Sequence, residues 1–566
     1  MIVASCVVGC QTAGSNSNKN DMDLAILNAK IWTGVRGAPD AQALGITADR
    51  IVVVGSNDDV RKQVTPHTRV IDAQGRRVIP GMTDTHIHTI WGGRMLSQLD
   101  LRDVPDRQAF IDAVARRARA LPPGQWLLGG NWNVESWPDE TPPRKEWIDS
   151  VTGDRPMFLG RTDGHQSLAN SAALKLAGID RNGPPDPEGG EIERDPQTNE
   201  PTGILKDAAE SLVASKIPSP SEDEMYRALG DAMRALNRVG ITAVQDLTEV
   251  EQLPVWVRAR HENALTIRMT GYLSVSFWDA YHEKLKSFPV HDEWLRMNGF
   301  KGYMDGSLGS RTAYMREPFT DATPQSKYPR GMLMSMVQPP PRFREMLRRA
   351  DAAGFQCAVH AIGDEAIHIL LDHYDAVLQQ PTTLPSVDES KRLGPRRPRI
   401  EHSQHILPED ITRFGTVGVV AVMQPRHKHD DGRFAEAAIG KERSQTTYAW
   451  RGLLRSNAAV VFGSDWPVAS PDPFAGIAAA VTGLTADGEV WVPEQNITVA
   501  EALRAYTVTP AWVEGREADR GTIEPGKLGD VVILTQDVLA VPQDQINQTK
   551  VSHTIIAGRV VWETKD

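Results

Sequence analysis

The chain has 566 residues, of which 40% are hydrophobic and 24% are charged, the composition of an ordinary globular protein. Its length suggests more than one domain, although an elaborated barrel can absorb most of it. The formal net charge of −11 argues against a nucleic-acid-binding surface, and the sequence lacks the run of 18 or more apolar residues that predicts a transmembrane helix.

Residues 1–20 form a leader that contains two of the three cysteines, Cys6 and Cys10. The motif Val7-Val8-Gly9-Cys10 resembles a bacterial lipobox, which predicts a lipid anchor at Cys10 and an extracytoplasmic, membrane-tethered protein. The apolar run is short and no basic segment precedes it, so a slightly apolar leader of a cytoplasmic protein remains the alternative. Three cysteines cannot build a disulfide framework, and we expect Cys357 to be a buried, inert thiol.

Short alternating segments rich in β-branched residues occur at both ends of the chain. They lie at 23–28, 45–54, 69–72, 77–79, 529–534 and 554–562, with hairpin turns expected at 48–50 and 557–558. None of these segments contains a candidate metal ligand. We therefore expect residues 21–80 and 521–566 to form one composite β-sandwich domain.

The stretch from about 91 to 205 is rich in Trp and Pro and looks irregular. It is too long for a strand-to-helix loop, so we expect an insertion after the first barrel strand, over the catalytic face. We expect its tryptophans to form mainly the insertion's own core, although loops above a barrel mouth also line pockets. These tryptophans are Trp126, Trp132, Trp137 and Trp147.

From Glu222 onward, helix-like and strand-like segments alternate. Glu222 to Val239 is an amphipathic helix that ends before Gly240, and 341–353 and 364–378 are also helix-like. Eight apolar runs of strand length occur: one before His86, then 241–244, 267–275, 300–304, 355–359, 399–400, 417–423 and 460–462. Alternating helices and buried strands predict an α/β fold, a (β/α)8 TIM-like barrel over residues 81–520.

The stretch Pro80-Gly-Met-Thr-Asp-Thr-His-Ile-His88 follows an apolar run, Val78-Ile79, that reads as the end of a buried strand. Side chains alternate along a strand, so His86 and His88 face the same way and suit one metal ion. An isolated His-x-His is weak evidence, because a strand can carry two histidines for no chemical reason. Further candidates lie in or at the end of later strands, where barrel chemistry occurs: Lys301, His360, His402 and Asp465. Together they predict a metal site.

These residues resemble the amidohydrolase superfamily, specifically the YtcJ-like branch called amidohydrolase family 3, from about Asp23 to the C-terminus. The motifs that carry the resemblance are Pro-Gly-x-x-Asp-x-His-x-His, Asp163-Gly-His165, Gly189–Ile192, Asp305–Ala313, His360–Asp364, Glu401-His402, Met423-Gln-Pro425 and Gly463–Pro467. The resemblance implies an eight-stranded barrel, a composite β-sandwich and a two-metal hydrolytic centre that usually holds zinc.

The resemblance also implies a ligand set: His86, His88 and Asp465 for the more buried metal, His360 and His402 for the second, and Lys301 between them. Lys301 would bridge the two metals only as a carbamate formed with carbon dioxide, because an ammonium group has no lone pair. The alternative is that Lys301 forms an ion pair and the site holds one metal.

Two cations beside a water lower its pKa from 15.7 towards about 7 and supply a hydroxide nucleophile near neutral pH. Asp465 would accept the proton and pass it to the leaving nitrogen. We therefore predict hydrolysis of an amide-type, non-peptide C–N bond of a small molecule. The alternatives are a hydrolase of a lactone, ester or phosphoester on the same site, and a catalytically silent binding or regulatory relative.

Four residues fall where loops face the barrel mouth and are expected to contact substrate: Asp163, His165, Gln424 and His427. The alternative for each is hydrogen bonding behind the metal ligands. Many relatives carry a glutamate after Thr-Gly-x-Leu, where this chain has Lys206-Asp207, which weakens any transfer of substrate. Residues 429–431 read as a solvated loop, and a homodimer is a further hypothesis.

Overall fold

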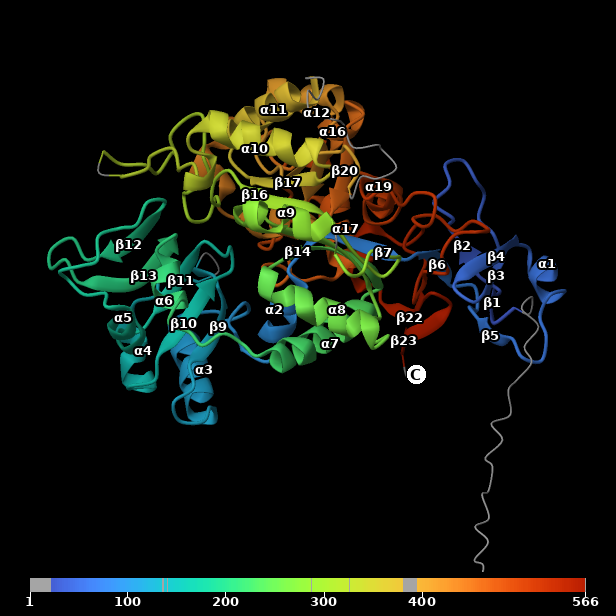
Figure 1. The fold of residues 1–566 in the computed structure, drawn as a ribbon, viewed down its shortest axis with the longest axis horizontal. Coiled ribbons are helices and arrows are strands. Elements are labelled where there is room, and N and C mark those ends of the chain that lie inside the picture. Colours follow the sequence, from blue (N-terminus) through green and yellow to red (C-terminus); the bar gives the residue numbers. More distant parts are fainter. Residues whose placement is uncertain are drawn as a thin grey trace, which may run out of the picture.

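The computed structural model describes residues 22–134, 137–139, 141–286, 288–324, 326–379 and 394–564. The predicted leader and its lipid anchor at Cys10 lie outside these residues. Within the described ranges, no helix has both the length and the apolar character needed to span a bilayer. A central barrel lies between the insertion, drawn in teal, and β-structure built from both ends of the chain, drawn in blue and red (Figure 1).

The barrel sheet has eight strands, and each pair of neighbours in it is parallel. In spatial order they are β7 (Met82–Ile87), β14 (Ile241–Thr248), β15 (Arg268–Ser274), β16 (Leu295–Tyr303), β17 (Gln356–Ala361), β18 (Arg399–His402), β19 (Val420–Met423) and β20 (Ala459–Phe462). The two outer strands meet where Asp465 N donates to His86 O at 2.7 Å and His88 N donates to Trp466 O at 3.0 Å. The predicted α/β fold with an eight-stranded barrel is confirmed.

The apolar run before His86 is two strands rather than one. Val78 and Ile79 belong to β6 (Arg77–Pro80), which pairs with β21 (Val531–Leu534) outside the barrel. Gly81 separates β6 from β7, and a Cβ at this position would lie 2.2 Å from Thr242 Oγ1 on β14. This close approach favours glycine at the point where the chain enters the barrel.

Two sheets are assembled from the ends of the chain. One contains β4 (Arg50–Gly55), β3 (Ala43–Thr47), β1 (Leu24–Leu27) and β5 (Arg69–Asp72); the other contains β2 (Lys30–Ile31), β6, β21, β22 (Val551–Ile556) and β23 (Arg559–Glu563). Leu24, Ile46, Val531 and Ile555 belong to one shared core, so strands from both termini pack together. The predicted domain boundaries at residues 80 and 520 stay predictions.

Helices follow most of the barrel strands. They are α2 (Thr89–Met95), α7 (Glu222–Arg238), α8 (Leu253–His261), α9 (Trp278–Lys286), α10 (Pro340–Ala352), α11 (Asp364–Gln379), α12 (Ile411–Val417), α13 (Pro425–Asp431), α16 (Trp450–Arg455), α17 (Pro473–Thr482), α18 (Val499–Tyr506) and α19 (Val508–Val513). The three predicted helices correspond to α7, α10 and α11. Helix α7 starts where Ser221 and Glu224 form a capping box, and it buries Met225, Leu229 and Met233 at helical spacing.

The insertion is a regular domain with a sheet and helices, so the prediction that this stretch is irregular was wrong. Its sheet has the order β12 (Gly190–Arg194), β13 (Pro201–Asp207), β11 (Gln166–Ala169), β10 (Met157–Arg161), β9 (Leu127–Trp132), β8 (Leu99–Asp100). Its helices are α3 (Arg107–Ala120), α4 (Lys145–Thr152), α5 (Ser171–Ala177) and α6 (Glu210–Ala214). Trp132, Trp137 and Trp147 lie in its main core and Trp126 packs on a second one, as predicted.

Candidate metal centre

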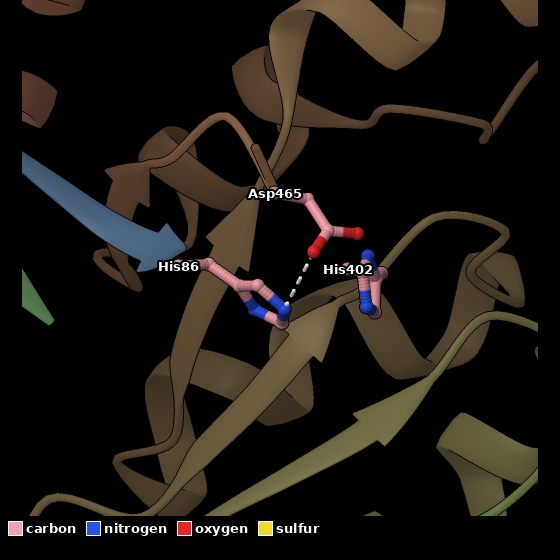
Figure 2. A group of neighbouring side chains, drawn as sticks. All are labelled: His86, His402 and Asp465. Carbon is pink, nitrogen blue, oxygen red and sulfur yellow. Dashed lines mark ion pairs between the residues drawn. The ribbon is translucent and has the colours of Figure 1, made fainter. Parts of the chain in front are cut away.

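Three of the predicted metal ligands form a compact cluster at the carboxyl ends of the barrel strands (Figure 2). His86 lies in β7, His402 ends β18, and Asp465 follows β20 by three residues. One ligand atom from each residue lies within 4.8 Å of the others. The 3.3 Å between His86 Nε2 and Asp465 Oδ1 suits two ligands that share one ion at roughly 2.0–2.1 Å.

The other three predicted ligands surround this cluster. His88 Nε2 lies 3.5 Å from Asp465 Oδ1, and Lys301 Nζ lies 3.4 Å from His86 Nε2. The centroid of the His360 ring lies 4.5 Å from that of His402. The structure therefore brings six side chains, carried by five strands or the residues that directly follow them, to the wall of a single cavity.

The hydrogen bonds of two histidines leave one ring nitrogen of each available to a metal. His402 Nδ1 lies 2.9 Å from Gln424 Oε1, and His360 Nε2 lies 3.0 Å from the carbonyl oxygen of Gly306. Because both acceptors are oxygens, the contacting nitrogen carries the proton. Burial also lowers the pKa of His360 and of His402 well below the usual range, so both rings offer a lone pair.

His86 and Lys301 are held by buried charges. His86 Nδ1 lies 2.5 Å from Glu401 Oε2, which turns its Nε2 toward Asp465. Burial opposes ionisation of Glu401, but the charge of Arg399 and the hydrogen bond from His86 outweigh it and lower the pKa of Glu401 to about 2. Burial lowers the pKa of Lys301 to about 8, although Glu401 and Asp465 oppose this shift.

The backbone is strained at two of the ligands. His402 and Asp465 have φ angles of 71° and 58°, in the left-handed region that costs a non-glycine residue on the order of 1–3 kcal/mol. Asp84, in the opening motif, holds the loop that contains Asp465. Its carboxylate accepts hydrogen bonds from Ser464 N at 2.9 Å and Ser464 Oγ at 2.5 Å. The backbone strain at Asp465 is therefore maintained by the contacts between β7 and the loop after β20.

The cluster opens into a cavity of about 210 Å³, which is smaller than the roughly 300–1,000 Å³ of drug-sized ligand sites and restricts it to a small compound. Besides the predicted ligands, its walls include the apolar and aromatic side chains of Trp91, Tyr303, Leu308, Phe434 and Val468. Polar residues on the walls include Asn133, Arg161, Gln404, Asp430 and Asp431. The cavity is thus bounded by both the barrel loops and the insertion.

Asp163 and His165 come from the insertion and line the cavity. The Asp163 carboxylate accepts hydrogen bonds from Ser307 Oγ at 2.8 Å and Ser310 Oγ at 2.7 Å, and it also contacts Arg161. Asp163 therefore fastens the insertion to the loop after β16. His165 Nδ1 lies 2.7 Å from Asp207 Oδ1, so the aspartate that replaces the expected glutamate orients this imidazole.

Gln424 and His427 were both predicted to contact substrate, but only His427 lines the cavity. Gln424 is buried behind His402 and is not among the residues that line the cavity. His427 lines the cavity, and its ring lies parallel to that of His402 with centroids 6.1 Å apart. Only His427 of this pair is placed to meet a substrate.

The solvated-loop interpretation of residues 429–431 was wrong, because all three residues lie in helix α13 and both Asp430 and Asp431 line the cavity. Asp431 ends this helix and accepts a hydrogen bond from Tyr448 Oη at 2.7 Å. Burial raises the pKa of Asp431 to about 7. Its spacing from His427, four residues along one helix, was the signal that both face the same side.

Two further residues at the centre were not predicted. Tyr303 lines the cavity with Lys301 Nζ 4.8 Å from its ring centroid, and it follows Lys301 by two residues on β16, hence on the same face. Glu401 was quoted only as part of a motif, yet it fixes the orientation of His86. No local pattern distinguishes such a supporting carboxylate from a surface one.

Comparisons with known proteins agree with this geometry. Residues 69–562 match the model of the amidohydrolase family. Protein LONG AFTER FAR-RED 3 of Arabidopsis thaliana is 35% identical over 91% of this chain and 87% of its own length. Putative amidohydrolase YtcJ of Bacillus subtilis (strain 168) is 29% identical over 94% and 98%, and the N-substituted formamide deformylase of Arthrobacter pascens is 26% identical over 96% and 98%.

Among solved structures, an uncharacterized metal-dependent hydrolase from Pyrococcus furiosus superimposes with a TM-score of 0.70 and 26% identity, covering 91% of this chain and 99% of that one. The family model spans most of the sequence, including every predicted ligand. The chain therefore belongs to the amidohydrolase family.

Proposed function

We propose that this protein is a metal-dependent hydrolase that cleaves an amide-type, non-peptide C–N bond of a small molecule. The observation that carries the proposal is the convergence of six ligand-type side chains on the wall of one small cavity, three of them with ligand atoms within 4.8 Å of one another. The similarity to an N-substituted formamide deformylase along nearly the whole chain supports this type of bond.

We further propose that the centre holds two divalent ions, zinc in the simplest case. His86, His88 and Asp465 would hold one ion, His360 and His402 the other, and Lys301 would bridge them as a carbamate. The donor set fits such ions, because neutral imidazoles and a carboxylate suit zinc. Bound at these residues, divalent ions would lower the pKa of a water towards neutrality and polarise the carbonyl oxygen of the substrate.

The remaining chemistry belongs to the protein's own side chains. Asp465 accepts the proton of the nucleophile and delivers it to the leaving nitrogen, from a position 3.3 Å and 3.5 Å from the His86 and His88 nitrogens. His165 and His427, which both line the cavity, contact the substrate. Trp91, Leu308 and Phe434 favour a substrate with an apolar substituent on the amide.

A substrate panel on zinc-replete protein tests the proposal. It should contain N-substituted formamides with apolar and with charged substituents, N-acyl amino acids, hydantoins, lactones and phosphoesters. We expect turnover of at least one amide-type compound, with apolar substituents preferred. Turnover of lactones or phosphoesters alone would transfer the assignment to the alternative bond type, and zinc-replete protein inert to the entire panel would support a silent binding relative.

A further inference from the structure

A continuous chain of buried polar contacts leads away from the metal centre into the barrel. It begins at His86, whose Nδ1 contacts the Glu401 carboxylate. Arg399 holds the same carboxylate in a two-pronged ion pair, with Nε 2.7 Å from Oε1 and Nη2 2.9 Å from Oε2. The side chains of Arg399 and Glu401 are both 0% exposed, so water does not compete for these contacts.

The chain continues through Gln245 on β14. Arg399 Nη1 donates to Gln245 Oε1, and Gln245 Nε2 donates to Glu514 Oε1 at 2.8 Å and lies 3.4 Å from the Pro510 carbonyl oxygen. The other oxygen of Glu514 is paired with Arg520. Because Gln245 has an amide group, its two ends are not equivalent: the oxygen must face Arg399 and the nitrogen must face Glu514.

This chain runs from one end of the barrel to the other. His86 lies near the carboxyl end of β7, whereas Arg520 lines a small polar cavity with Gly81, Thr83 and Thr242, at the amino ends of β7 and β14. Barrel interiors are usually filled by branched apolar side chains. Burying an ion costs several kcal/mol unless good geometry offsets it, so a buried chain of this length calls for a reason beyond packing.

We propose that this chain is a positioning device for His86, in which Arg399, Gln245 and Glu514 act through Glu401 to set the affinity of the metal centre from the opposite end of the barrel. Glu514 selects the orientation of the Gln245 amide, because a carboxylate accepts only the NH2 end. The amide oxygen then holds Arg399 against Glu401. Glu401 in turn keeps the His86 proton on Nδ1 and the lone pair on Nε2.

The inference rests on the proposed function only in requiring a metal site, so it is tested with zinc alone. The test variant is Gln245→Met, which interrupts the chain between its two charged ends while nearly preserving side-chain volume. The matched control is Asp537→Asn, which weakens the two-pronged pair between buried Arg77 and Asp537 (2.8 Å and 2.9 Å) in the terminal β-structure, away from the chain. Two quantities are measured on each protein: the zinc Kd by chelator competition and the Tm of the metal-free form.

Both variants should lower the Tm, because each leaves a buried charged group without its full set of partners. Only Gln245→Met should raise the zinc Kd, by about 10- to 100-fold, the usual effect of losing a partner that supports a ligand. A zinc Kd within about twofold of wild type in Gln245→Met, or an equal rise in Asp537→Asn, would overturn the inference and leave the chain with a purely structural role.

If Gln245→Met does not fold, Glu514→Met removes the acceptor of the Gln245 amide, one contact further from His86. It is judged by the same comparison, with an expected rise in the zinc Kd of about three- to tenfold, below the range for a direct partner of a ligand. A wild-type protein that binds zinc but hydrolyses nothing in the panel leaves this inference standing and removes the proposed function. A wild-type protein that binds no divalent metal removes both.

Discussion

Replacing Asp465 by asparagine separates the two roles assigned to this residue. The carboxylate lies 3.3 Å and 3.5 Å from the two histidine nitrogens of the opening motif and is buried, so it is placed both to bind a metal and to carry a proton. Asparagine keeps the size and one carbonyl oxygen, but its amide is a poor base. The variant should therefore retain a ligand and lose the proton acceptor.

The expected loss is a decrease in kcat of roughly 10²- to 10⁴-fold, the effect of removing a positioned acid–base group. This corresponds to about 3–5 kcal/mol in the activation free energy. Metal content should fall less than in His86→Asn or His88→Asn, because the histidines and Lys301 remain. The assay is kcat and zinc content measured side by side after reconstitution with excess zinc, with the substrate identified in the panel.

If Asp465→Asn retained near wild-type kcat with full metal content, the proton acceptor would be another residue. Asp163 or His165 of the insertion would then be the next side chain to replace, because both line the same cavity. Asp163 comes first: burial lowers the pKa of His165, but the hydrogen bond and charge of Asp207 outweigh burial and raise it to about 9, so this imidazole already carries a proton near neutral pH. If instead the variant lost metal as completely as His86→Asn, the two roles could not be separated and the assignment of Asp465 as the base would lose its support.

Three further predictions concern a bridging lysine, a buried lysine and the leader. Intact mass under non-acidic conditions should show a carbon dioxide adduct that Lys301→Ala lacks; one tightly bound metal with full activity in that variant would refute the bridge. Burial lowers the pKa of Lys428 to about 7. Between about pH 7 and pH 10 this lysine is therefore protonated in the unfolded chain but largely neutral in the folded one, so the free energy of unfolding should rise with pH across that window. Lys428→Met should abolish this rise and have the higher Tm at pH 7, and parallel Tm profiles from pH 6 to 10 would contradict the reasoning. A fatty-acid analogue should label Cys10 in protein expressed with its full leader, and unlabelled protein found only in the cytosol would exclude the anchor.

The sequence predicted the barrel because its strands are short apolar runs of regular spacing, and burial produces that pattern. The ligands were predictable for a related reason: His86, His360 and His402 stand at strand ends, and a barrel brings all strand ends to one face. Lys301 was placed mainly by resemblance, since a lysine within a strand has no distinguishing local pattern. The geometry of the candidate metal site is therefore largely a consequence of the barrel's topology.

The insertion was not predicted as a regular sheet because its residues oppose that structure locally. Strand β9 contains Gly129 and Gly130 at φ angles of 146° and 152°, and a Cβ at either would lie about 2 Å from a carbonyl oxygen of the neighbouring strand. Glycine normally weakens a strand, yet close approach of strands requires it here. The Gln245–Glu514 contact was equally inaccessible, because 269 residues separate its partners.

Elemental analysis of zinc-reconstituted, extensively dialysed protein tests the central claim most directly, with His86→Asn/His402→Asn as the comparison. Wild-type protein should retain two zinc ions per chain, and the double variant should retain markedly less, since it loses ligands from both proposed positions. The circular-dichroism spectrum of the variant shows whether it is still folded. Wild-type protein that retains no zinc, or a folded double variant that retains as much as wild type, would contradict the assignment of this cluster as a metal centre.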